Sequence, residues 1–285
     1  MYESAIALGT FDGIHIGHQA VLNSALNSKS YPIVITFDIP PRNHFGKSVG
    51  LLQLPEDKKR CLTALGFKKV IFLDFLKLKN LKPQEFLKCL KDDYNCESIS
   101  CGFNYRFGKD GKGDVRLLKD FCNNNGIELR VLDPVTENGE TVSSTYIRHL
   151  LSCGEIKQAN ELLYKPFGFT AKVVDGDKRG RTIGFPTINQ RYPENLTKIK
   201  NGVYKSSVLI DGKIYNAITN IGVRPTFKTD YISAETNIQG FDGDIYGRDI
   251  ELSLIEFIRD ERTFSGVAEL KEQIKRDIEY LYKNK

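Results

Sequence analysis

The stretch of sequence that decides the fold is GTFDGIHIGH, residues 9–18. It follows the short apolar run Ala5–Leu8 and leads into Ala20–Leu22, after which apolar residues continue at helical spacing. An apolar run, a glycine-rich turn and a helical pattern follow one another here, so we predict a strand, a turn and the start of a helix.

Two histidines stand at the start of this predicted helix. His15 and His18 are three residues apart, so they should project from one face of the first turn. A helix N-terminus offers unpaired N–H groups and a partial positive charge, which suit phosphate, and glycines let backbone approach a ligand closely. We therefore predict a polyphosphate cradle, against the alternative of an ordinary turn with two surface histidines. The predicted phosphate-binding residues are Gly9, Phe11, Asp12, Gly13 and Gly17.

The bulk composition is that of a folded, soluble protein. The chain has 285 residues, of which 40% are hydrophobic and 27% are charged, and it is long enough for two domains. Its net charge of +5 is spread evenly over the sequence, without a polybasic arm. Bulk electrostatics therefore do not indicate a nucleic-acid-binding protein, although a mildly basic surface suits small anions.

The six cysteines show no metal or disulfide pattern, because none forms a C-x-x-C pair and none lies beyond residue 153. The first residues lack the pattern of a signal peptide, and no apolar run approaches membrane-spanning length. We expect a cytoplasmic protein with reduced thiols.

The first half alternates strand and helix patterns. Strands are expected over residues 32–37, 69–75, 98–103 and 128–132, and helices over residues 55–65, 83–90 and 114–125. This alternation predicts a parallel sheet with right-handed crossovers, in which ligands bind beyond the carboxyl ends of the strands.

Two more segments follow predicted strands of this half. In CGFNYRFGKDGKGD (residues 101–114), Asn104 could hydrogen-bond a base or ring edge; the alternative is a mobile surface loop. In TVSSTYIR (residues 141–148), Ser144, Thr145 and Arg148 crowd a predicted helix start, where hydroxyls and a guanidinium can hold phosphate. As an isolated string, this second segment equally fits an ordinary helix cap followed by an arginine.

The pattern changes near residue 165, after a predicted short helix over residues 155–164. We expect one domain over residues 1–164 and a second over residues 165–285. Strands are expected over residues 169–174, 203–210, 213–221 and 250–258, with a hairpin at Asp211-Gly212 and a single long helix over residues 267–282. This pattern predicts an antiparallel barrel closed by a C-terminal helix.

The segment of the second half that is most typical of a binding site is GDKRGRTIGFPTIN, residues 176–189. Its glycines and basic residues suit a loop that folds over phosphates, against the alternative of an ordinary glycine-rich connection. Thr187 and Asn189 alternate onto one face of an extended segment, where their oxygens could help to hold Mg²⁺. The predicted phosphate-binding residues of this loop are Gly176, Lys178, Arg181 and Gly184.

Taken together, the three segments of the first half resemble the adenylyltransferase module of bifunctional riboflavin kinase/FAD synthetases, over residues 5–163. The resemblance implies a Rossmann-like nucleotidylyltransferase domain with an H-x-G-H motif. One departure concerns TFDIPPR, residues 36–42, where the family usually has T-F-x-P-H-P; His44 is out of register.

The second half resembles the riboflavin kinase module of the same family. The pattern G-R-x-x-G-x-P-T-x-N is followed in family order by motifs at residues 201–204, 220–227, 235–247 and 258–264. The resemblance implies that Glu235 is the general base for the riboflavin 5′-hydroxyl and that Arg224 and Arg259 serve the flavin. Asn237 stands where the family commonly has histidine.

The resemblance implies that the chain phosphorylates riboflavin to FMN and then adenylylates FMN to FAD, with ATP and Mg²⁺ in use. His15, His18 and Arg148 are the expected catalytic residues of adenylylation, and Glu235 that of phosphorylation. We expect the partners to be ATP, riboflavin and FMN, with neither nucleic acid nor membrane, in a monomer or weak homo-oligomer. One alternative is a riboflavin kinase with a degenerate adenylyltransferase domain, supported by the departure at residues 37–42. Another is a non-enzymatic nucleotide- or RNA-binding protein, since H-I-G-H also occurs in tRNA-charging enzymes.

Overall fold

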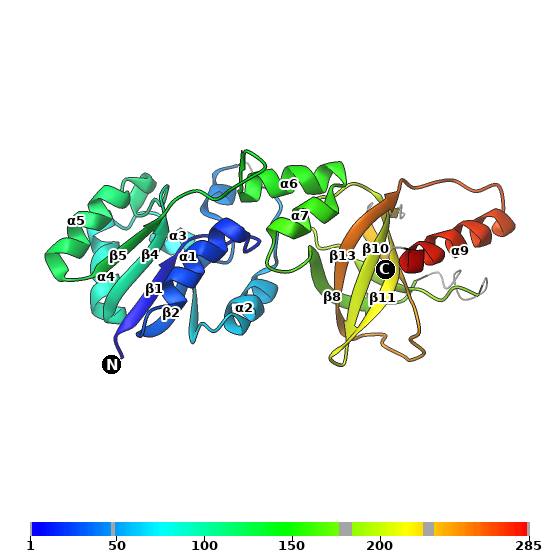
Figure 1. Cartoon of the computed structure of the whole chain (residues 1–285), viewed down its shortest axis with the longest axis horizontal. Helices are drawn as coiled ribbons and strands as arrows, with labels where there is room; N and C mark the ends of the chain where they lie inside the picture. The colour runs from blue at the N-terminus through cyan, green and yellow to red at the C-terminus, as the bar shows by residue number, and fades with distance from the viewer. Residues whose placement is uncertain (1, 47–48, 177–183, 225–230, 284–285) are drawn as a thin grey trace. The chain divides into compact units, whose positions relative to one another are not determined.

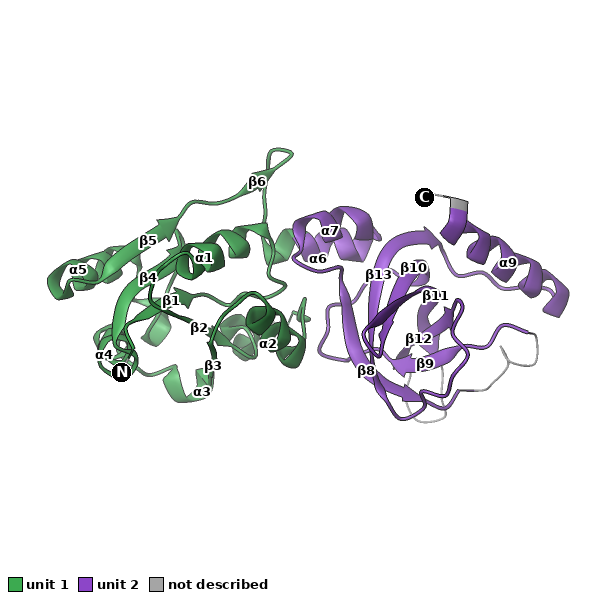
Figure 2. Ribbon diagram, turned by 60° about the horizontal axis from the view of Figure 1, so that its bottom comes forward, with its two compact units in different colours: residues 1–146 green, residues 147–285 purple. Residues whose placement is uncertain are grey.

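The structure, a computed structural model, describes residues 2–46, 49–176, 184–224 and 231–283. The chain divides into two compact units, residues 1–146 and residues 147–285 (Figures 1 and 2). Helix α6 (Ser144–Cys153) runs across this division, and α7 (Ile156–Leu162) belongs to the second unit.

The first unit is a five-stranded parallel sheet with helices on both faces (Figure 1). Its strands are β1 (Ser4–Leu8), β2 (Tyr31–Phe37), β3 (Lys69–Leu73), β4 (Cys96–Gly102) and β5 (Glu128–Leu132), with a small ribbon of β6 (Thr136–Glu137) and β7 (Glu140–Thr141). Its helices are α1 (Ile16–Leu26), α2 (Pro55–Ala64), α3 (Phe75–Leu78), α4 (Pro83–Tyr94) and α5 (Val115–Asn125), with the 3₁₀ turns η1 (Pro41–Phe45) and η2 (Lys109–Gly111). The strand order is β3-β2-β1-β4-β5.

Side-chain alternation along the strands divides the core between the two faces of the sheet. Ile6 and Leu8 of β1 join a cluster with side chains of α4 and α5, whereas Ala7 joins a cluster with side chains of α1 and α2. Successive strand residues point to opposite faces, so a strand buried on both faces needs an unbroken apolar run. The sequence Ala5–Leu8 supplies that run.

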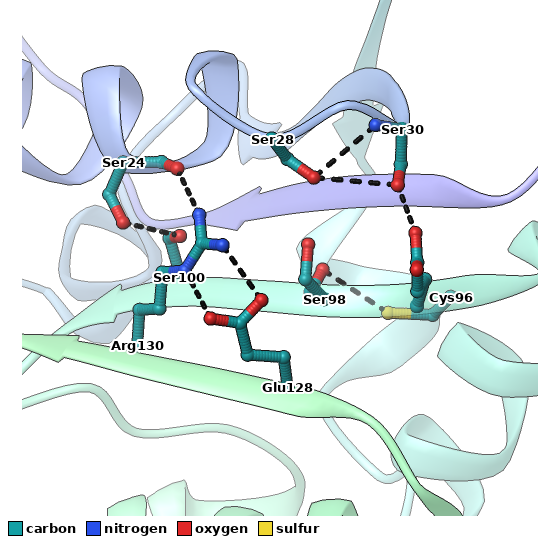
Figure 3. Close-up of polar contacts among 9 residues, drawn as sticks. Ser24, Ser28, Ser30, Cys96, Ser98, Ser100, Glu128 and Arg130 are labelled. Atoms are coloured by element: carbon teal, nitrogen blue, oxygen red, sulfur yellow. Dashed lines mark hydrogen bonds and ion pairs between the residues drawn. The ribbon is translucent and has the colours of Figure 1, made fainter.

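The end of α1 is fixed to the sheet by polar contacts (Figure 3). Arg130 of β5 forms a two-pronged ion pair with Glu128 and donates from Nη1 to the carbonyl of Ser24, at 2.7 Å. The Ser100 hydroxyl of β4 donates to Ser24 Oγ at 3.0 Å. A cation on the last carbonyls of a helix complements its dipole, so α1 is held with its other end at the carboxyl edge of the sheet.

The second unit is a closed antiparallel barrel with a helix packed on it (Figures 1 and 2). Its strands are β8 (Gly168–Val174), β9 (Ile188–Arg191), β10 (Gly202–Ile210), β11 (Lys213–Arg224), β12 (Tyr231–Ile238) and β13 (Asp249–Arg259), and its last helix is α9 (Val267–Lys283). The order around the barrel is β10-β11-β12-β9-β8-β13. Leu281 and Ile278 of α9 pack on Val203 and Ile218, so the apolar stripe of the helix faces β10 and β11.

The predicted fold class is confirmed for both units, and most element bounds agree within a few residues. The predicted hairpin at Asp211-Gly212 is present, with φ of 49° and 78° at the two turn residues. The strand predicted over residues 69–75 was too long: it ends at Leu73, because the Asp74 side chain accepts from Leu76 N and caps α3. Strand β12 was missed, because several of its buried residues, Ser233, Thr236 and Asn237, are polar and give no apolar signal.

Candidate active sites

The turn between β1 and α1 has an uncommon backbone. Phe11 has φ of 44° and Ile14 has φ of 41°, both in the left-handed region, and Gly13 between them has φ of 90°. A bulky or β-branched residue adopts such angles only when its surroundings enforce them, and such strain concentrates at functional sites. Phe11 and Ile14 are each 1% exposed, so packing holds the turn in this shape.

Gly9 is required by the ring of Phe11. A Cβ on Gly9 would lie 2.8 Å from the tip of that ring, closer than side chains tolerate. The ring also meets His18 edge to face, with centroids 5.4 Å apart. The first glycine of the motif therefore lets Phe11 fold back over the strand end and support the histidine.

His15 and His18 lie together at the start of α1, as their spacing predicted. His15 is the N-cap, and its Nδ1 accepts from the backbone N–H of His18 at 3.3 Å. The two rings stack with centroids 3.6 Å apart. Nδ1 of His18 is buried and has no hydrogen-bond partner among the described residues.

Both imidazoles are held in the neutral form. Burial lowers the pKa of His15 to about 4. Burial, and then the nearby His15 and Lys58, lower the pKa of His18 well below its ordinary value. Near neutral pH each ring therefore offers one N–H donor and one acceptor, because a neutral imidazole carries a single ring proton.

The three motifs of the first half meet in one cavity of about 490 Å³ at the carboxyl edge of the sheet. It is lined by the β1 turn and the start of α1, by residues 102–106 after β4, and by residues 141–145 at the start of α6. Residues 132–135 after β5 and residues 37–42 after β2 complete the wall. The segment after β2, which differs from the family pattern T-F-x-P-H-P, therefore still lines the cavity. It does so through Phe37, Pro40, Pro41 and Arg42.

The remaining predicted residues of this unit occupy different positions around the cavity. The Ser144 hydroxyl donates to the Asp12 carbonyl at 3.0 Å, and Asp12 Oδ1 accepts from Leu52 N at 2.9 Å, so these two residues also brace the turn. Thr145 and Asn104 are exposed and line the cavity. The lining residues of α6 end at Thr145, and Arg148 lies one turn further along the helix.

The barrel brings together residues that are far apart in the sequence. Asn189 of β9 lies directly across from Glu235 of β12 in the antiparallel register, so their side chains share a face. Arg224, at the end of β11, forms an ion pair with Glu235 at 3.0 Å. A carboxylate, an amide and a guanidinium are thereby collected on three neighbouring strands.

The segment that carries Thr187 and Asn189 is held in place from two sides. Asn237 donates from Nδ2 to the Pro186 carbonyl at 2.7 Å. A Cβ on Gly176 would lie 2.2 Å from Asn189 Nδ2, so only glycine fits there. Asn189 is 6% exposed, and its Oδ1 has no hydrogen-bond partner among the described residues.

Arg259, the last residue of β13, is held by the C-terminal helix. It forms a bidentate ion pair with Asp277 of α9, with nitrogen–oxygen distances of 3.0 and 2.7 Å. The Asp277 side chain is 5% exposed. Gly184 is exposed, whereas Lys178 and Arg181 lie outside the described residues.

Sequence reasoning missed two charged residues beside these sites. Lys58 of α2 is 2% exposed and donates to the carbonyls of Thr10 and Phe37. Asp277 is the partner of Arg259. Neither stands in a motif, and a lysine in an amphipathic helix ordinarily faces solvent, so no local signal identified them.

A parallel sheet with a histidine pair at its first strand–helix turn is joined in one chain to an antiparallel barrel, and the family models that match these two units are those of nucleotide-dependent transferases. A family model described as FAD synthetase matches residues 1–146, and one described as riboflavin kinase matches residues 163–284. The chain belongs to the family of bifunctional riboflavin kinase/FMN adenylyltransferases, and it is an enzyme.

Relatives of that description cover nearly the whole chain. The enzyme from Bacillus subtilis is 34% identical over 96% of this chain and 90% of its own length. That from Listeria monocytogenes is 35% identical over the same shares. A crystal structure described as a macrolide-efflux protein from Streptococcus pneumoniae is 31% identical and superposes with a TM-score of 0.89, covering 99% of this chain and 95% of that one.

That crystal structure supports the fold of both units. The efflux named in its description is said of that protein alone. Among the described residues, no helix is both long enough and apolar enough to cross a membrane.

Proposed function

We propose that the chain makes FAD from riboflavin in two steps at two separate sites. Riboflavin and ATP give FMN in the barrel, and FMN and a second ATP give FAD and pyrophosphate in the sheet unit. We assign the second reaction to residues 1–164 and the first to residues 165–285. The observation that carries this proposal is the convergence of three distant motifs on one cavity of the sheet unit.

In adenylylation, an oxygen of the FMN phosphate attacks the α-phosphorus of ATP. A new oxygen–phosphorus bond forms, the bond to the β-phosphate oxygen breaks, and pyrophosphate leaves. The attacking phosphate is already an anion and needs no general base, so catalysis rests on positioning and on donors aimed at the developing charge. His15 and His18, as neutral donors at a helix N-terminus, fit this task.

The other groups around this cavity have supporting roles in the proposal. Gly9, Phe11, Asp12, Gly13 and Gly17 shape the turn that receives the triphosphate. Ser144 and Thr145 would donate hydroxyl hydrogen bonds to the phosphates, and Arg148 would add charge from the next turn of α6. Asn104, exposed at the cavity wall, would bind the adenine or flavin ring edge.

In phosphorylation, Glu235 accepts the proton of the riboflavin 5′-hydroxyl as that oxygen attacks the γ-phosphorus of ATP. Arg224 orients the carboxylate through the ion pair at 3.0 Å. Arg224 and Arg259 are assigned to the flavin side, with Arg259 set by Asp277. Gly176 and Gly184, together with Lys178 and Arg181, are assigned to the loop over the phosphates.

The residues present also fit a magnesium ion at the kinase site. Asn189 offers a buried amide oxygen without a partner among the described residues, and Thr187 lies two residues earlier, just before β9. Oxygen ligands suit Mg²⁺, which keeps few protein ligands and binds largely through phosphate oxygens and water. Thr187 and Asn189 would hold the ion, which when bound would neutralise charge on the phosphates.

We propose that ATP, riboflavin and FMN are the only partners, without nucleic acid or membrane, and that the enzyme acts in the cytoplasm as a monomer or weak homo-oligomer. The even charge distribution supports the absence of a nucleic-acid partner.

The test is to incubate the pure protein with riboflavin, ATP and Mg²⁺ and to separate the flavins by chromatography. Formation of FAD supports both steps. FMN alone would mean that the adenylyltransferase half is degenerate, and unchanged riboflavin would overturn the enzymatic proposal.

A further inference from the structure

Lys58 is the most deeply buried lysine beside the cavity of the sheet unit. It is 2% exposed, and its ammonium donates to the carbonyl of Thr10 at 3.1 Å and to that of Phe37 at 2.5 Å. These carbonyls lie just after β1 and at the end of β2, so one cation joins the carboxyl ends of two neighbouring strands. Burying a charge is costly unless it is well compensated, so such a position calls for an explanation.

The contacts of Lys58 lead directly to the histidine pair. The Thr10 carbonyl that it binds also accepts from Thr36 Oγ1 at 2.9 Å, so this peptide group is held from two sides. The next residue is Phe11, with its left-handed backbone and its ring against His18. Lys58 is thus separated from the His18 ring by a short chain of fixed contacts.

The groups that interact electrostatically with Lys58 come from three parts of the sheet unit. Asp12 in the turn and Asp38 after β2 attract the ammonium and raise its pKa, while burial lowers that pKa to about 8 as the larger effect. On α1, His18 responds to the Lys58 charge and to its stacked neighbour His15. The cation therefore acts on His18 through space as well as through the backbone.

We propose that Lys58 is a positioning residue for adenylylation, holding the turn at residues 9–13 in the shape that stacks His15 and His18 at the cavity. It does so through the Thr10 and Phe37 carbonyls, without touching substrate. This inference rests on the proposed function. The competing explanation is that Lys58 only stabilises the fold.

The test replaces Lys58 by methionine, which has similar length and no charge or donor. We expect kcat for FMN adenylylation to fall at least thirtyfold, while riboflavin phosphorylation by the same sample stays within twofold. Leu90→Ala is the control, because Leu90 is buried on α4 in the core cluster on the other face of the sheet, which contains neither Phe11 nor Ile14. It should lower stability comparably and keep adenylylation within threefold.

A second readout separates positioning from stability. Removing the Lys58 charge should raise the pKa of His18, measured by NMR titration of the imidazole. Lys58→Arg, which keeps charge and donors, should recover most of the adenylylation. If Lys58→Met does not fold, Lys58→Gln takes its place with the same thresholds.

Adenylylation that stays within threefold in the folded variant would overturn the inference, as would an equal loss in Leu90→Ala. These outcomes leave the proposed function intact. The proposed function itself fails only if the unaltered protein makes no FAD, so the two failures are distinguishable.

Discussion

The two candidate sites of this chain are assembled in opposite ways. In the sheet unit, ten consecutive residues build the turn, the helix start and both histidines. In the barrel, Asn189, Arg224 and Glu235 come from three strands and meet only through antiparallel register. The histidine-bearing turn is therefore local, although distant segments complete the cavity around it, whereas the charged cluster of the barrel exists only once the barrel has closed.

The sites also differ in how they handle charge. The imidazoles of the sheet unit are kept neutral by burial, as the lowered pKa values of His15 and His18 indicate. In the barrel, Glu235 forms an ion pair with a neighbouring arginine and remains partly exposed. One unit therefore presents neutral imidazoles in a fixed turn, and the other presents charged groups aligned across strands.

The largest effect should come from the proposed general base. Glu235→Gln removes the proton acceptor with little change of shape, so FMN formation should fall by roughly a thousandfold. Conversion of supplied FMN to FAD should continue at its normal rate, because its proposed site lies in the other unit. Both rates are measured by chromatography of the flavins.

The matched control for this change is Asp249→Asn, which removes an exposed carboxylate from another strand of the barrel. It should leave both rates unchanged. If Glu235→Gln abolished both reactions in a protein that remains folded, the assignment of separate sites would be wrong.

His18→Ala should have the opposite effect, impairing adenylylation and sparing phosphorylation. Loss of a donor from a preorganised site typically costs a hundredfold to a thousandfold, so we expect adenylylation to fall by roughly that factor. Riboflavin phosphorylation should persist, so the flavin product becomes FMN. His149→Ala, on the exposed face of α6, is the control and should still yield FAD.

The difference between the sites explains what the sequence could predict. The strand–turn–helix unit, the shared face of His15 and His18 and the helix that ends at Asn125 before Gly126 follow from neighbours in the chain, so pattern and spacing were sufficient. Local pattern also predicted the hairpin at Asp211-Gly212. The positive φ of Phe11 and Ile14 was not predictable, because packing imposes it against the preference of those residues.

Contacts over long sequence separation were beyond prediction from the residues alone. Glu235 was one acidic residue among many until the family resemblance identified it, and β12, which carries it, was missed. Lys58 reads as a surface lysine because nothing nearby shows that its ammonium reaches Thr10, 48 positions away. Burial and register decide such roles, and neither is encoded in a short window of sequence.

Removing the ion pair of Arg259 and Asp277 tests how much the stability of the barrel unit depends on paired charges. Asp277→Asn leaves a largely buried guanidinium without its carboxylate, so we expect a loss of about 3 kcal/mol in the free energy of unfolding. Urea denaturation measures this loss. Gln273→Ala removes only the neutral donor to Asp277 and should cost about 1 kcal/mol.

Asp277→Asn also tests the proposed role of Arg259 in binding the flavin. If Arg259 serves the flavin from a position set by Asp277, the KM for riboflavin should rise in Asp277→Asn, with adenylylation of FMN unaffected. An unchanged KM in the folded variant would restrict Arg259 to holding α9 on the barrel.

The smallest effect, and the one that compares the units most directly, is their response to mild acid. His15 has a pKa of about 4 in the folded chain and about 6.5 when unfolded, so the unfolded state binds more protons between these values. The contribution of neutral His15 to the free energy of unfolding is complete above pH 6.5 and is lost as the pH falls toward 4. Between pH 7 and pH 5.5 the loss from His15 should be about 1 kcal/mol, and His18 should add to it in the same direction.

The barrel strands contain no histidine, because all four histidines of the chain lie at or before position 149. Hydrogen exchange measured by mass spectrometry on the intact chain reports opening of each unit separately. Exchange should therefore accelerate in β1 and α1 at pH 5.5, after correction for intrinsic rates, while β10 and β11 are unchanged. In His15→Gln the acceleration of the sheet unit should be smaller, since one of the two histidines whose pKa burial lowers is gone. Equal acceleration in both units would show that neutral imidazoles do not set the acid response of the sheet unit, and this difference between the two sites would then be lost.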